Sequence, residues 1–120
     1  MAIPSRILSA GNSPLATVSI AGDGAVGLVA VGSTASDPLQ LSAVWNTLTT
    51  SSSGTGVKLP PTEAGAMVGI RNDSGQTIKV YPFNTSSTVN AGAASVDIAT
   101  AKTMILFAIS ATTWASVTTA

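Results

Sequence analysis

The groups in this sequence best suited to acid–base or metal chemistry are five carboxylates, at Asp23, Asp37, Glu63, Asp73 and Asp97. Two carboxylates held roughly 5–10 Å apart suffice to hydrolyse a glycosidic bond. Each of the five, however, has Gly, Ser or Pro nearby, in a context typical of turns or strand edges. We therefore expect solvated turn residues, and a hydrolase only if two of these carboxylates meet in a cleft.

The sequence contains no histidine and no cysteine. Their absence removes most nucleophile–base pairs and nearly all zinc sites. Gly22-Asp23-Gly24 offers one carboxylate, whereas a calcium site needs several oxygen ligands in series. The lysines are expected on solvated strand faces, at Lys58, Lys79 and Lys102. We therefore predict a protein that is not an enzyme and has no catalytic residue, metal ion or cofactor.

Aromatic residues are the remaining candidates for ligand contact, because exposed rings can stack on sugars or bases. We expect Phe107 and Trp114 in the core. Trp45 and Tyr81 stay open between a subunit interface and a ligand site.

Charge is sparse and balanced, with five basic and five acidic residues and a formal net charge of zero. A nucleic-acid-binding surface needs clustered Lys and Arg, and here the basic residues are scattered, so no nucleic acid partner is expected. Near-zero net charge favours association of small proteins. Together with a hydrophobic fraction of 45%, this indicates a subunit that covers part of its surface with neighbours.

No run of 18 apolar residues occurs, so no membrane span is expected. The first 13 residues lack the apolar central region of a signal peptide. Synthesis in a cytoplasm is therefore the expectation.

Short segments with a period of two dominate the chain, and no helical periodicity persists beyond two turns. The tight-turn sequence Asn72-Asp73-Ser74-Gly75 predicts a hairpin over residues 66–82. Residues 103–109 are apolar at nearly every position, which predicts a strand buried on both faces or covered by a partner. The expected strands cover residues 15–20, 26–31, 39–49, 57–59, 66–72, 77–82, 88–90, 95–98, 103–109 and 113–117.

This spacing predicts an all-β protein: a single-domain antiparallel β-sandwich or β-barrel of about 8–10 short strands over residues 13–120, preceded by an N-terminal arm at 1–12. The expected core consists of Leu28, Leu41, Leu48, Val57, Leu59, Val68, Ile70, Ile78, Val80, Ile98, Ile105, Phe107, Ile109 and Trp114.

A succession of motifs resembles small structural proteins of tailed bacteriophages, in particular capsid decoration (cement) proteins and related virion modules. The motifs are GTGVKLPP (54–61), MVGIRNDSGQ (67–76), IKVYPF (78–83), Asn90-Ala91-Gly92-Ala93 and ILFAISATTW (105–114), with GNSPLATVSIAGDG (11–24) and GLVAVGST (27–34) upstream.

The resemblance implies a β-sandwich or barrel subunit, usually a homotrimer, made in the host bacterial cytoplasm and fixed on the outer surface of the virion head. There it would bind the major capsid protein and stabilise contacts between capsomers. The same fold also suits a fibre or tail module that binds a host receptor or glycan, since a fold does not fix a function. That alternative predicts an exposed groove with Trp45 or Tyr81 beside a carboxylate.

The first dozen residues carry apolar side chains without a strand pattern. We expect this arm to become ordered only on binding, with capsid contacts at Ile3, Arg6, Ile7 and Leu8. Deletion of residues 1–9 is then expected to leave the fold intact and to weaken attachment to the capsid.

Overall fold

The structure of the protein is a computed structural model that describes residues 10, 11, 13 and 22–120. The expected strand at 15–20 and the expected arm contacts Ile3, Arg6, Ile7 and Leu8 lie outside the described residues. The described residues form strands and no helix, so the all-β class is confirmed. The strands are β1 (Gly24–Val29), β2 (Leu39–Gln40), β3 (Trp45–Thr50), β4 (Gly56–Lys58), β5 (Met67–Asn72), β6 (Ile78–Tyr81), β7 (Thr88–Val89), β8 (Val96–Ile98), β9 (Lys102–Ala108) and β10 (Thr113–Thr118).

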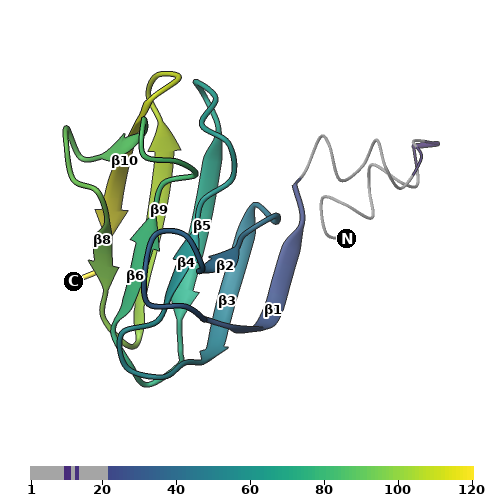
Figure 1. The fold of residues 1–120 in the computed structure, drawn as a ribbon. Helices are drawn as coiled ribbons and strands as arrows, with labels where there is room; N and C mark the ends of the chain where they lie inside the picture. Colours follow the sequence, from purple (N-terminus) through teal and green to yellow (C-terminus); the bar gives the residue numbers. More distant parts are fainter. Residues whose placement is uncertain (1–9, 12, 14–21) are drawn as a thin grey trace.

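The strands form two sheets that face each other (Figure 1). The larger sheet has the order β1-β3-β5-β9-β10-β7, and the smaller has the order β2-β4-β6-β8. From β1 to β6 the chain crosses to the other sheet after every strand. Each coil therefore places one strand in each sheet, and successive coils stack in parallel.

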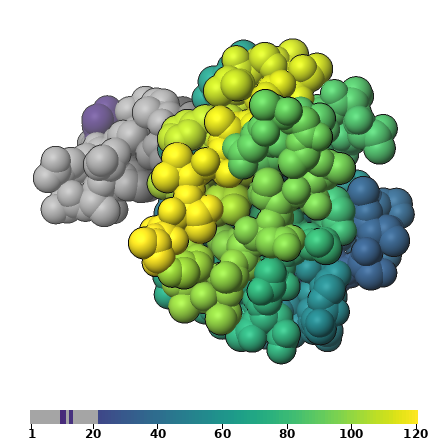
Figure 2. Space-filling model, turned by 90° about the vertical axis from the view of Figure 1, so that its left-hand side faces the viewer, coloured from purple at the N-terminus to yellow at the C-terminus, as the bar shows by residue number. Residues whose placement is uncertain are grey.

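The antiparallel sandwich or barrel expected from the sequence is therefore not what the structure shows. The sheets are mixed and resemble a short β-solenoid. Among the described strands, antiparallel pairing occurs between β8 and β6 and between β9 and its neighbours β5 and β10. At the edge of the larger sheet, β7 pairs in parallel with β10. Figure 2 shows β10, in yellow, beside the green segment that contains β7 and β8.

The expected hairpin over residues 66–82 is wrong for a specific reason. Residues 72–75 do turn the chain, and Gly75 has the positive φ of 84° that a tight turn allows. However, β5 and β6 belong to different sheets. The buried Asn72 holds this crossing, because its amide group donates hydrogen bonds to the carbonyls of Gln76 (2.7 Å) and Ile98 (2.9 Å).

Most of the expected core is found between the two sheets. The members that are buried there are Leu41, Leu48, Val57, Leu59, Val68, Ile70, Ile78, Val80, Ile98 and Trp114. Leu28 is half-buried and packs against this cluster, and Ile105 is half-buried.

Two core assignments, Phe107 and Ile109, are wrong, since both side chains are exposed. Along β9 the residues alternate: Met104, Leu106 and Ala108 point into the core. The intervening side chains must then point to the outside of the larger sheet, because successive strand residues face opposite ways. That outer surface is not covered by any described part of the chain at Phe107.

Candidate functional site

The outer surface of the larger sheet carries a continuous apolar patch. Strand register places Met67 beside Phe107 and Phe107 beside Ala115. The neighbouring row runs from Trp45 across Gly69 and Ile105 to Val117. We call the side chains of these two rows the apolar face: Trp45, Met67, Ile105, Phe107, Ala115 and Val117.

The large side chains of the apolar face are strongly solvent-exposed. The exposed fractions are 43% for Trp45, 48% for Met67, 43% for Phe107 and 65% for Val117. Monomeric soluble proteins rarely leave several large apolar side chains together on one sheet surface, and such patches mark interaction sites. The arrangement can therefore bind another apolar surface, and it offers no group for covalent or acid–base chemistry.

The border of the apolar face is polar and carries one compensated charge. The next row of the sheet consists of Thr47, Arg71 and Thr103. The Arg71 side chain is paired with Asp73 at 2.7 Å and also donates to the carbonyl of Ala101 at 2.9 Å. This pairing removes an unpaired positive charge from the edge of the patch, so the surface favours apolar contact over binding of an anion.

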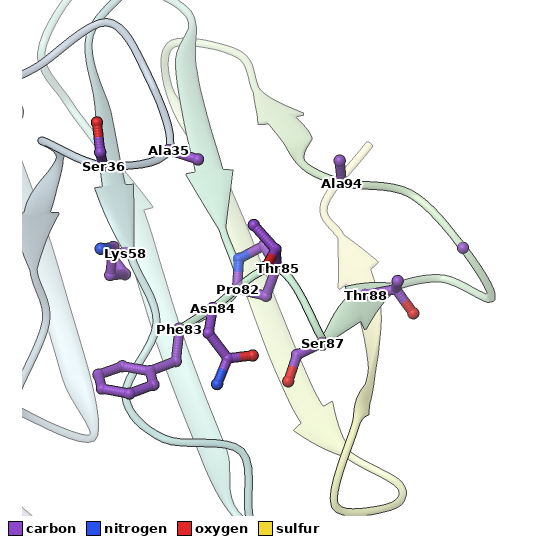
Figure 3. A pocket seen from close by; sticks show the side chains of 11 residues that line it. Ala35, Ser36, Lys58, Pro82, Phe83, Asn84, Thr85, Ser87, Thr88 and Ala94 are labelled. Atoms are coloured by element: carbon purple, nitrogen blue, oxygen red, sulfur yellow. The ribbon is translucent and has the colours of Figure 1, made fainter.

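A second candidate site is a cavity of about 600 Å³ associated with the smaller sheet. Its lining comes from the loop residues Ala35 and Ser36, from Lys58 on β4, and from the segment that follows β6, including Pro82, Phe83 and Ser87 (Figure 3). Volumes of 300–1,000 Å³ are usual for small-molecule sites. None of the lining residues belongs to the apolar face, although Thr88 comes from β7 at the edge of the larger sheet.

The loop at one wall of the cavity is held by a carboxylate. The Oδ1 atom of Asp37 accepts hydrogen bonds from the backbone N–H groups of Ser33 (3.2 Å) and Thr34 (2.9 Å) and from the Thr34 hydroxyl (2.9 Å). These bonds, led by the one from the Thr34 backbone, lower the pKa of Asp37 below its ordinary value of 3.8. Asp37 therefore fixes the position of Ala35 and Ser36, and it has a structural role.

Three of the other four carboxylates also serve structure. Asp23 accepts a hydrogen bond from the backbone N–H of Val44 at 3.1 Å. Asp73 and Asp97 form ion pairs with Arg71 and Lys79. Among residues 22–120, and the few described before them, no three acidic side chains gather into a possible metal site.

Of the predicted contact residues, Trp45 is placed on the apolar face, whereas Tyr81 is buried at 8% exposure against Gly56. Neither residue lines the cavity, and no carboxylate does so. Sequence analysis missed Lys58, Phe83 and Ser87 as a group. The segment Pro82-Phe83-Asn84 after a strand indicates an exposed aromatic loop, but only the fold brings Lys58 to it.

No family model matches this chain, and neither does any curated protein or solved structure. In the portion of the chain that the structure describes, there is no helix with the length and apolar character needed to cross a membrane.

Proposed function

We propose that this protein is a non-enzymatic structural subunit of a bacteriophage virion, a decoration protein on the outer surface of the head. In this proposal it forms a homotrimer through the apolar face and binds the major capsid protein. The observation that carries the self-association is the exposure of the large apolar side chains of the apolar face, at Trp45, Met67, Phe107 and Val117. The virion location comes from the resemblance of the sequence motifs to decoration proteins.

The scaffold supports such a role because it presents a broad, regular surface. We propose a short β-solenoid, closed by antiparallel strands, as the detailed fold. Four strands placed side by side, β3, β5, β9 and β10, hold the apolar face on a hydrogen-bonded frame. A rigid frame lowers the entropic cost of ordering an interface, which leaves more of the contact energy for binding.

A decoration protein works by mass action. It binds the assembled shell in preference to free coat subunits and so lowers the free energy of the assembled state. A trimer contacts several coat subunits at once and gains avidity, so that each contact can be of modest affinity. Each useful interface would bury on the order of 1,000 Å².

The proposal is tested by light scattering on the purified full chain, followed by imaging of capsids assembled with and without it. We expect a mass three times the 11.8 kDa of the chain and density on the outside of the head. A lone monomer that has no affinity for the viral particle would contradict the proposal.

The second candidate is a fibre or tail module that binds a host receptor or glycan. The cavity beside Phe83 favours this alternative, because it is a concave site with an exposed aromatic ring. Binding of the purified protein to a glycan array, or to host cells, in the absence of capsid attachment would favour it over the first proposal.

A further inference from the structure

We propose that the cavity associated with the smaller sheet binds a saccharide that carries a carboxylate group. Ser87 lines this cavity and has only 5% of its surface exposed. A side chain this buried has a defined hydrogen-bonding direction, and that direction determines which ligand atoms it can meet. Figure 3 shows Ser87 among the lining side chains.

A directed chain of hydrogen bonds reaches Ser87 from the core. The indole N–H of Trp114 can only donate, and it donates to the Thr62 hydroxyl oxygen at 3.0 Å. The Thr62 hydroxyl in turn donates to the hydroxyl oxygen of Ser87 at 3.0 Å. The proton of the Ser87 hydroxyl has no acceptor among the described residues and is available as a donor to the cavity.

Asn84 is also oriented as a donor. Its side-chain oxygen accepts hydrogen bonds from the backbone N–H of Ser86 (3.1 Å) and from the Ser86 hydroxyl (2.9 Å). These bonds occupy the acceptor, and the amide NH₂ group of Asn84 forms none to the rest of the described chain. A ligand in the cavity would therefore meet N–H donors at this residue.

Lys58 adds a full positive charge. Its ammonium group forms no ion pair with the described residues, in contrast to Arg71 and Lys79, and no carboxylate lines the cavity. The two donor groups, at Ser87 and Asn84, and the uncompensated cation together favour a ligand with a negatively charged oxygen acceptor. A carboxylate fits this requirement.

The remaining walls suit a sugar ring. Phe83 is 38% exposed, and the buried Pro82 lies beside it in the lining. An aromatic face packs against the C–H groups of a sugar, and the lining residues Thr85 and Thr88 carry hydroxyl groups of the kind that bind ring hydroxyls. A simple carboxylic acid would use Lys58 and leave these walls empty.

The experiment is a titration of the ¹⁵N-labelled full chain, followed by NMR, with glucuronic acid, glucose and acetate as separate probes. We expect glucuronic acid to shift the amide signals of residues 58 and 83–88, with an affinity about tenfold above that of glucose or acetate. Equal affinity for glucose, or for acetate, would overturn the proposal, as would the absence of any shift at these residues.

Variants separate the site from general charge effects. Lys58→Gln and Phe83→Ala are each expected to weaken glucuronic acid binding about tenfold, whereas Lys102→Gln, the matched control outside the cavity, leaves it unchanged. Retained affinity in Lys58→Gln would contradict the assignment. The saccharide site does not depend on the virion proposal. The oligomeric state of the same samples tests that proposal separately, because it reports on the apolar face of the larger sheet.

Discussion

The indole ring of Trp45 lies directly over the α-carbon of Gly69, its partner on the neighbouring parallel strand. A β-carbon on Gly69 would overlap the ring atoms Cε3 and Cζ3. Gly69 is therefore required here for space, and the ring in turn buries it. This contact sets the position of the largest side chain of the apolar face.

Replacing Gly69 with Ala is expected to displace the Trp45 ring and to lower the free energy of unfolding by about 1–3 kcal/mol. Chemical denaturation measures the loss, and tryptophan fluorescence shows the change at Trp45, since Trp114 stays buried. Gly24→Ala is the matched control on the other side of Trp45, where a β-carbon would meet its nearest atom at 3.9 Å. If both variants lose the same stability, the steric explanation is wrong.

Phe107→Ser is expected to weaken self-association about tenfold or more, because it removes a large apolar side chain from the centre of the apolar face. The monomer should lose little stability, since this ring already faces solvent. Light scattering over a dilution series measures the change. Phe83→Ser, which removes a similarly exposed ring at the other sheet, serves as the control and should keep the oligomer.

Asn72→Ala is expected to cost about 3 kcal/mol of unfolding free energy, because it leaves the buried carbonyl of Ile98 and the partly buried carbonyl of Gln76 without their donor. The amide group of Asn72 donates two hydrogen bonds. Its side-chain oxygen accepts two more, from the Ser74 backbone N–H (3.1 Å) and from the Ser74 hydroxyl (2.7 Å). Thermal and chemical unfolding measure the loss.

The comparison for this variant is Asn46→Ala. Asn46 is equally buried, but its side-chain oxygen has no hydrogen-bond partner among the described residues. Its amide group donates only to the carbonyls of Ala43 and Gly69. We expect Asn46→Ala to lose less unfolding free energy than Asn72→Ala. A larger loss for Asn46→Ala would show that the hydrogen bonds at the Asn72 crossing are not the dominant polar contribution to stability.

Acid is expected to loosen the loop at the cavity wall. The pKa of Asp37 is lower in the folded protein than its ordinary 3.8. Its stabilising contribution is thus complete above about pH 3.8 and is lost as the pH falls through the lowered value. Amide NMR signals of Ser33 and Thr34 should report this change in a titration, and Asp37→Asn should remove the pH dependence. A loop that moves identically in the variant would point to another group.

The positions of the strands could be predicted from the sequence. Alternation of apolar and polar residues located the described strands within about two residues, with the run at 39–49 divided into β2 and β3. It also identified the buried positions on β5 and β6, because side chains of a strand point alternately to its two faces.

Only the tertiary structure decided which sheet each strand joins. The turn at Asn72–Gly75 is compatible with a hairpin, and the buried hydrogen bonds of Asn72, to Ile98 in particular, direct the chain to the other sheet instead. The same long-range packing leaves Phe107 exposed and brings Lys58 to Phe83 and Ser87. A local pattern specifies on which face of a strand a residue lies. What packs against that face depends on residues distant in the chain. The apolar face and the cavity therefore became visible only in the fold.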